Sequence, residues 1–397
     1  MPTASPTSGI DRQLTGSDFN SFFAYQADYG EVNDPLVFQP LRKGSGGIKY
    51  APTYTQSPER PADREGVAQV QDIANLDATI SSGVSLQSFG LFRASICGIA
   101  ETTTTETAST FSSTSTTIAG PSGWTDDLAV GDWFFAEGFV AASLNIAYQV
   151  VSKTSTAVTT YPSPAVVEAE GAAVTVKSFK TVTGDTPTLL TMQDRAPDDT
   201  AVGGVRYRTA YNGFINTATM TIPETGPLTY ETTVQFEKLL PSVEAVAGQS
   251  DSAAPADDAL SSVQNIEQFI VNNLFATCSV KSMSFQYSNN NQVDNAAGCG
   301  QRFGLGQISL SGSIVARSPK SNPFVFRNYF ENGTNITGTG VVLNFGSGKK
   351  AVIIMDRIKI TEHDQSTEAN VIASSSCTFN AEKGQYGKTL RIYTNFN

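Results

Sequence analysis

The stretch Ile80-Ser-Ser-Gly83-Val-Ser-Leu86, followed by Phe89-Gly-Leu-Phe92-Arg-Ala-Ser-Ile96, decides the fold because a similar pattern returns later in the chain. The second copy reads Ile308-Ser-Leu-Ser-Gly312-Ser-Ile314-Val315 and then Pro323-Phe324-Val-Phe326-Arg327-Asn-Tyr329-Phe330. Each copy joins a strand-like Ser-Gly segment to a short amphipathic segment that is anchored by aromatic side chains. Segments typical of a long β-hairpin follow both copies. The repetition predicts one β-rich module that is used twice in tandem.

The composition agrees with a mainly β protein of more than one domain. The chain has 397 residues, of which 40% are hydrophobic and only 16% are charged, so each domain can form its own core. Ser, Thr, Gly and β-branched residues are abundant, as in strands joined by many turns. The net charge of −11 argues against non-specific binding of nucleic acid or anionic lipid through a general positive field.

A separate small β domain is predicted inside the first module. Residues Thr102 to Thr117 are so polar that we interpret them as a linker. From Trp124 to Val176 apolar and polar residues alternate between Gly, Asn and Pro breaks, which is typical of a small antiparallel β domain. Trp124 and Trp133 both lie there, and core aromatics are a simpler interpretation than ligand platforms.

The remaining boundaries come from changes in composition. Residues 242–262 are acidic, small and polar, which predicts a flexible connector, and apolar residues at helical spacing predict a short helix over 259–272. The predicted organisation is an N-terminal arm (1–35), a first module (36–105 and 185–241), an inserted linker and β domain (106–184), an acidic linker with a short helix (242–272), and a second module with a C-terminal arm (273–397).

No pattern in the chain indicates catalysis, a cofactor or a metal site. None of the cysteines Cys97, Cys278, Cys299 and Cys377 forms a CxxC pair, and His363 is the single histidine, so the usual zinc spacings are excluded. Buried free thiols are the simpler interpretation, with a Cys278–Cys299 disulfide as the alternative. His363 lies near a predicted hairpin tip, and no nucleophile elbow accompanies it. We predict that the protein is not an enzyme.

The N-terminus does not have the pattern of a signal peptide, and no apolar run approaches the ~20 residues of a membrane helix. We therefore expect the chain to fold in a cytoplasm, with no membrane partner.

The order of the motifs resembles that of a known family. Asp72 to Gly83 precedes the aromatic-anchored helix, and an inserted domain follows with Val130-Gly-Asp132-Trp-Phe, Gly138-Phe139 and a Tyr-Gln-Val-Val-Ser run that ends at Ser152. This arrangement is similar to the major tail tube proteins of long-tailed, non-contractile (siphovirus-type) bacteriophages. The resemblance extends over nearly the whole chain after residue 35. It depends on the order of the motifs, since each motif alone has little specificity.

The resemblance implies a structural virion protein that is built from tail-tube-type β-sandwich modules. Such subunits assemble into stacked rings that form the tail tube, a conduit for genome delivery. Six modules form the usual ring, so a chain with two modules implies homotrimeric, pseudo-hexameric rings, with a homohexamer as the alternative. The implied partners are the tape measure protein, the tail terminator and distal tail proteins, and double-stranded DNA that passes non-specifically through the lumen. The implied location is the virion tail, after assembly in the host cytoplasm.

The resemblance also implies roles for particular segments. The loops 54–69 and 288–300, the aromatic arm 17–29 and the C-terminal segment 386–397 would reach the next ring. An ordinary surface loop is the alternative for each loop, and docking onto the chain's own core is the alternative for the aromatic arm. Strands over 70–86 and 301–317 would line an acidic lumen that repels DNA phosphates. The candidate inter-ring residues are Phe19, Phe22, Phe23, Tyr54, Glu59, Arg60, Arg64, Asn290, Tyr386 and Tyr393, and the candidate lumen residues are Asp72 and Asp77.

Two other functions share parts of this sequence pattern. A receptor- or carbohydrate-binding tail or surface protein would have the same Ser/Thr-rich β composition, but it would remain a discrete oligomer. A polysaccharide-cleaving enzyme would need a deep cleft that holds two carboxylates. The tandem repeat favours the tube over both.

Overall fold

The structure is a computed structural model, and it describes residues 20–27, 29–30, 35–41, 44–56, 69–96, 99–198, 203–240, 243–276, 279–296, 300–318, 325–366 and 373–396. This part of the chain is mainly β, as predicted, and its two α-helices are α1 (Leu86–Ser95) and α2 (Val325–Glu331). Both helices lie within the aromatic-anchored segments that identified the repeat. Neither of them has the length and apolar character needed to span a membrane.

The same antiparallel strand order occurs twice. In the first repeat the order is β1-β12-β13-β14-β4-β3, and in the second repeat it is β16-β22-β23-β24-β21-β18. The strands of the first repeat are β1 (Asn20–Gln26), β3 (Ser45–Gln56), β4 (Gln69–Gly83), β12 (Leu189–Pro197), β13 (Val205–Ile222) and β14 (Thr229–Leu239). Those of the second repeat are β16 (Ile266–Val271), β18 (Val280–Ser288), β21 (Ser309–Arg317), β22 (Ile336–Gly346), β23 (Lys349–Ser366) and β24 (Ser374–Glu382).

The repeats correspond in register as well as in order. The pairing of β13 with β14 shifts between Ile215 and Thr217, and the pairing of β23 with β24 shifts between Ile360 and Glu362. Both limits of the shift therefore lie 145 residues further along in the second repeat. A bulge at the same place in both hairpins bends the two long strands in the same way.

The two repeats are joined edge to edge. Residues Thr217–Ile222 of β13 pair antiparallel with Met283–Ser288 of β18. This junction creates one continuous run of strands in the order β3-β4-β14-β13-β18-β21-β24-β23, which we call the long sheet. Its inward side chains and those of α1 belong to the largest hydrophobic core of the described residues.

Helix α1 covers the junction from the core side. The Phe92 ring lies 6.4 Å from that of Tyr230 in the first repeat and 5.8 Å from that of Phe285 in the second. The buried Asn289 side chain donates hydrogen bonds of 2.8 Å to the carbonyl oxygens of Ser95, at the end of α1, and of Ile215. One polar side chain of the second repeat thus satisfies backbone groups of the first, which holds the repeats in register.

The polar tract at residues 102–117 is not a linker but contains strands, and the strands after it pack around a hydrophobic cluster of their own. Residues Ile99–Ala108 form β5, which pairs along its length with β11 (Val174–Val182). Threonine is β-branched and suits a strand whose backbone hydrogen bonds are satisfied by a neighbour, so this tract becomes a stem. The domain beyond the stem contains β6 (Ser112–Ser113), β7 (Thr117–Ala119), β8 (Trp133–Glu137), η2 (Ala142–Leu144), β9 (Ala147–Lys153) and β10 (Ala157–Tyr161).

The two tryptophans are buried, as predicted, but in different cores. Trp124 packs inside the inserted domain with Phe111 and Phe134. Trp133 belongs to a separate cluster that also contains Tyr393, and it stacks on Phe275 with ring centroids 6.0 Å apart. Trp133 therefore fastens the inserted domain to the second repeat.

The acidic connector differs from its prediction in two ways. No helix forms over 259–272, because Ile266–Val271 is instead β16 and pairs with β22. The connector is also attached to the body of the protein, since β15 (Ser250–Asp251) pairs with β2 (Val37–Pro40) and Leu260 is buried. Apolar residues at helical spacing are also compatible with a short buried strand, and pairing with the edge of β22 favours the strand over the helix here.

The remaining strands outside the two repeats are short. They are β17 (Leu274–Phe275), β19 (Gln292–Ala296), β20 (Gly300–Gly304) and β25 (Leu390–Thr394).

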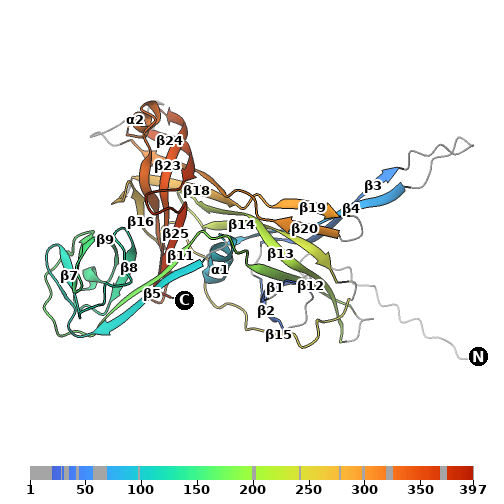
Figure 1. Ribbon diagram of the computed structural model, residues 1–397, viewed down its shortest axis with the longest axis horizontal. Coiled ribbons are helices and arrows are strands. Elements are labelled where there is room, and N and C mark those ends of the chain that lie inside the picture. Colours follow the sequence, from blue (N-terminus) through green and yellow to red (C-terminus); the bar gives the residue numbers. More distant parts are fainter. Residues whose placement is uncertain are drawn as a thin grey trace, which may run out of the picture.

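Figure 1 shows the first repeat and the second repeat side by side, with the inserted domain beside the second repeat at the opposite end from the β3–β4 hairpin. The β3–β4 hairpin projects away from the body, and the β19–β20 ribbon of the second repeat points in the same direction (Figure 1).

We expect the junction core to dominate the stability of the chain. Replacing the buried Phe285 by Ala removes its contacts with α1 and should lower the free energy of unfolding by about 3–5 kcal/mol. Denaturant-induced unfolding of the unassembled protein measures this loss. The matched control is Phe330→Ala on α2, where the side chain is 42% exposed and the expected change is within about 0.5 kcal/mol. Equal losses in both variants would contradict the assignment.

Candidate functional site

The face of the long sheet that points away from the core is lined by short polar side chains. At the junction, Gln286 Nε2 donates to Thr219 Oγ1 over 3.1 Å, and the hydroxyls of Thr221 and Ser284 lie 3.1 Å apart. These residues alternate with buried apolar residues along β13 and β18, as expected for a sheet with one solvated face. A shallow depression continues the polar face, and its lining includes Ser311, Ser313, Thr378, Asn380 and Glu362.

Charged groups are scattered over this polar face. Asp77 lies on it, opposite Lys49 of β3 and Gln235 of β14. Asp72 belongs to β4, but its side chain is outside the described residues. Carboxylates such as Glu231 are surrounded by Thr, Ser and Gln, so the face is rich in hydroxyl groups and only sparsely acidic.

The long sheet ends at two edges. At one end, β3 pairs with β4, and the Ile48 backbone N–H donates to Asp194 Oδ2 (2.8 Å) while its C=O accepts from Arg208 Nη1 (3.1 Å). At the other end, β22 pairs with β23 only up to Ile358, and β24 is the one described strand that pairs with the remainder of β23. Edges of this kind are the natural sites for strand pairing with another chain.

Of the candidate contact residues Tyr54, Glu59, Arg60, Arg64 and Asn290, only Asn290 has a described side chain. Tyr54 is part of β3, but its side chain is outside the described residues, and Glu59, Arg60 and Arg64 lie outside them altogether. Asn290 is exposed, and its Nδ2 donates to Gln307 O (2.7 Å) and to Ser309 Oγ (3.1 Å). Asn290 therefore fixes the base of the β19–β20 ribbon.

The aromatic residues near the N-terminus pack onto the chain itself. Phe19 is outside the described residues, whereas Phe23 is buried in the main core. Phe22 is half-buried below the Arg195 guanidinium, whose central carbon lies 3.7 Å from the ring centroid. Arg195 also contacts Asp251 at 2.6 Å, and its hydrogen bond lowers the pKa of that carboxyl group. Phe23 therefore docks onto the chain's own core, because pairing of β1 with β12 turns this side chain inward.

The C-terminal segment also packs inside its own chain. Tyr393 is fully buried in β25, which pairs with β23 on one side and with β11 on the other. The Tyr393 side chain therefore packs within its own chain. Tyr386 is half-buried beside the Arg391 guanidinium, whose central carbon lies 4.0 Å from the ring centroid. The sequence showed aromatic residues there but could not show that β25 inserts between two other strands.

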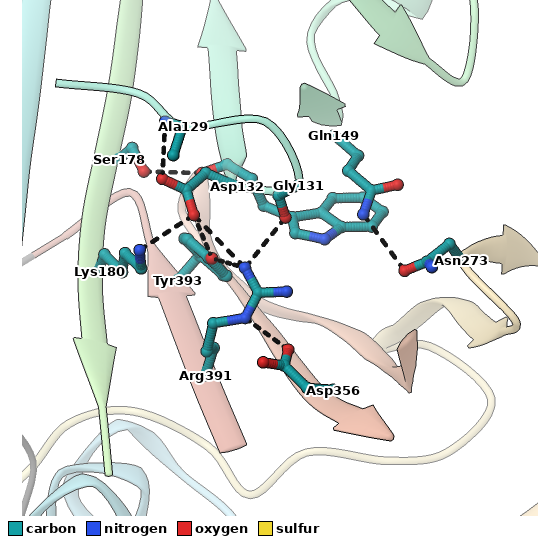
Figure 2. Close-up of polar contacts among 11 residues, drawn as sticks. Ala129, Gly131, Asp132, Gln149, Ser178, Lys180, Asn273, Asp356, Arg391 and Tyr393 are labelled. Atoms are coloured by element: carbon teal, nitrogen blue, oxygen red, sulfur yellow. Dashed lines mark hydrogen bonds and ion pairs between the residues drawn. The ribbon is translucent and has the colours of Figure 1, made fainter. Parts of the chain in front are cut away.

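A buried polar network surrounds Arg391, as Figure 2 shows. Arg391 Nε contacts Asp356 Oδ1 at 2.6 Å, and its Nη1 donates to the Gly131 carbonyl at 3.1 Å and to the Tyr393 hydroxyl. Tyr393 in turn donates to Asp132 Oδ1 at 2.8 Å. Because Asp132 belongs to the inserted domain and Asp356 to β23, a single guanidinium joins the inserted domain to the second repeat.

Burial explains the electrostatics of this network. Removal from water raises the pKa of the Asp356 carboxyl group, although the adjacent Arg391 offsets part of the effect. Burial alone would lower the pKa of Arg391, but Tyr393, Asp356 and Asp132 outweigh it, so that the guanidinium stays charged. Lys180 adds a second cation 3.1 Å from Asp132 Oδ1. The arrangement is a structural clamp in which every charge has an opposite partner.

The described residues do not bring reactive groups together. Cys377 is a free, buried thiol, and burial raises its pKa to about 12. Cys97, Cys278 and Cys299 lie outside the described residues, and so does the disulfide alternative. His363 lies within β23, where its Nε2 is 2.8 Å from Ser375 Oγ. In the described part of the chain, no group of three Asp, Glu, His or Cys side chains is placed to hold a metal ion.

We expect Arg391→Met to uncouple the inserted domain from the second repeat. The substitution leaves Asp132 and Asp356 with less compensation inside the protein, which should cost about 3–5 kcal/mol in the free energy of unfolding. Denaturant-induced unfolding measures the change. The control is Arg357→Met, which removes an exposed 2.9 Å ion pair with Glu382 and should cost about 0–1 kcal/mol. A similar small loss in both variants would show that the clamp is unimportant.

Comparison with known proteins agrees with this architecture. A profile of the phage tail tube protein family matches residues 16–381, which include both repeats and the inserted domain. No curated protein sequence matches the chain. The match extends over most of the chain, with the repeated strand order inside it. The chain therefore belongs to the phage tail tube protein family.

Proposed function

We propose that this protein polymerises into stacked rings that form the tail tube of a long-tailed, non-contractile (siphovirus-type) phage, and that the tube conducts the genome into the host. The observation that carries the proposal is the long sheet, which has a polar face and, among the described strands, an edge at each end with no further paired strand. A sheet with two open edges invites strand pairing, and closing it into a ring removes both edges.

The internal duplication supports a ring of three chains. Each repeat contributes four strands to the long sheet. Three chains contain six repeats and would therefore supply about 24 strands to a ring. At about 4.8 Å per strand, a closed barrel of about 24 strands is at least about 37 Å across at the backbone. That width admits a DNA duplex. A ring of six chains, the alternative, would have about twice this circumference.

The polar face of the long sheet would form the lumen. Its central side chains, such as Thr219, Ser284 and Gln286, are neutral, and the charge of Asp77 lies opposite that of Lys49. A surface of this kind does not neutralise phosphates and gains nothing from counterion release, so DNA passes without sticking. The tape measure protein would occupy the same lumen before the DNA does.

The projecting segments would connect one ring to the next. The β3–β4 hairpin and the β19–β20 ribbon point the same way from corresponding places in the two repeats (Figure 1). In a ring of three chains they would alternate around one rim. The same rim or its opposite would receive the tail terminator and distal tail proteins at the ends of the tube, and the inserted domain would lie on the outside.

Negative-stain electron microscopy of the concentrated, purified protein tests the proposal. We expect hollow rings or tubes, with three-fold symmetry at high resolution and six similar lobes at low resolution. Class averages that show discrete solid particles at all concentrations, even after addition of tail initiator proteins, would overturn the proposal. Binding of such particles to host surface glycans would instead support the receptor-binding alternative.

A further inference from the structure

We propose that the C-terminal half of β23 pairs with β3 of a second copy of this chain, in the register that the β13–β18 junction already shows within one chain. The inference rests on the proposed ring assembly and specifies the contact that closes it. The strand that pairs with β23 belongs to a second copy of the chain, because each copy carries both of the strands that form the contact, β3 and β23.

The first step is the correspondence of β23 with β13. The shared register shift places Ala218, Thr219 and Met220 in equivalent positions to His363, Asp364 and Gln365, each 145 residues later. On β13 these positions pair with β18. On β23 they lie beyond Ile358, where the pairing with β22 ends.

The second step is the correspondence of β3 with β18. Ile80 of β4 lies opposite Gly46, and its equivalent Ile314 of β21 lies opposite Met283. Ile80 and Ile314 are equivalent because they pair with Thr232 and Cys377, which are again 145 residues apart. Gly46 therefore corresponds to Met283. By the same offset, Ile48, Lys49 and Tyr50 of β3 correspond to Phe285, Gln286 and Tyr287 of β18.

The junction within the chain then dictates the register between chains. It pairs Ala218 with Tyr287, Thr219 with Gln286 and Met220 with Phe285. Transferred to two copies, the same register places His363 opposite Tyr50, Asp364 opposite Lys49, and Gln365 opposite Ile48.

The transferred register brings opposite charges together. Asp364 and Lys49 are both exposed in the single chain, and they take the places of Thr219 and Gln286, which share a 3.1 Å hydrogen bond. The Ile48 N–H and C=O point away from β4, so its neighbour Lys49 would occupy a non-hydrogen-bonded pair, where side chains approach most closely. A slip by two residues would keep the faces but would lose this particular pair.

Exposure supports the same contact. Tyr287 is fully buried at the junction, whereas its equivalent Tyr50 is 41% exposed. Helix α1 covers the junction with the fully buried Phe92, whereas α2, which packs on β23, has Phe330 42% exposed. The second copy would cover both aromatic side chains.

The edges also carry features that delay pairing in the free chain. Asp194 and Arg208 bond to the Ile48 backbone, and the incoming strand would replace those two hydrogen bonds. On β23, His363 and Gln365 stand where β13 has the apolar Ala218 and Met220. Polar residues of this kind keep an edge strand soluble until the proper partner arrives.

Disulfide cross-linking tests the register in the assembled protein. The variant Lys49→Cys with Asp364→Cys places two thiols in directly opposed positions, and mild oxidation of rings or tubes should link most chains into a covalent oligomer on a non-reducing gel. The matched control is Lys49→Cys with Glu362→Cys, which is displaced by two residues on the same face and should link at least about tenfold less. The single variants measure any background from the native cysteines.

The outcomes separate this inference from the proposed function. Cross-links in the first variant alone establish the contact and its register. Rings or tubes that form but link in neither variant, or better in the control, overturn the inference and leave the tube function intact. A protein that forms no rings at any concentration and no cross-links overturns both.

As a second test that introduces no cysteine, Lys49→Asp and Asp364→Lys should each impair polymerisation, and the double variant should restore it. Lack of restoration would contradict the Lys49–Asp364 pair.

Discussion

The structure depends on one constraint, which is that the edge of a β-sheet must be paired or covered. Within the chain, β13 of the first repeat and β18 of the second pair with each other, and α1 and Asn289 complete that junction from the core side. This pairing turns two four-stranded halves into the long sheet and aligns their polar faces. It also leaves one edge of the long sheet at β3 and one at β23, which are the edges that the proposed assembly would pair.

In the inserted domain, strand edges are likewise paired, but by strands that come from other parts of the chain. Its stem strand β11 pairs with β5, and the C-terminal strand β25 then fills the space between β11 and β23. The buried charges around Arg391 lie where these elements meet, and Trp133 adds apolar contact beside them. Buried ion pairs contribute little net stability, but separating one partner leaves an uncompensated buried charge, so the network disfavours detachment of the inserted domain from the second repeat.

Much of the fold was predictable because its signals are local. The Ser-Gly strands, the two aromatic-anchored helices and the alternating pattern of the inserted domain each occupy a short stretch. The errors occurred where a neighbour distant in sequence decides the outcome. The Thr-rich tract became β5 because β11 pairs with it, and residues 266–271 became β16 because β22 offered an edge. The sequence named Phe23 and Tyr393 as candidate inter-ring contacts, and it could not show their burial because aromatic composition does not show which way a strand faces.

The sequence by itself therefore determined the β composition, the tandem repeat and the resemblance to tail tube proteins, since these depend on residue types and on their order along the chain. Only the tertiary structure decided which strands pair, which of the described strands end the long sheet, and that Lys49 and Asp364 lie at opposite ends of it. The physical reason is that backbone hydrogen bonding between strands is nearly independent of side-chain identity. Register and partner choice consequently follow from the packing of the whole core and cannot be deduced from either strand alone.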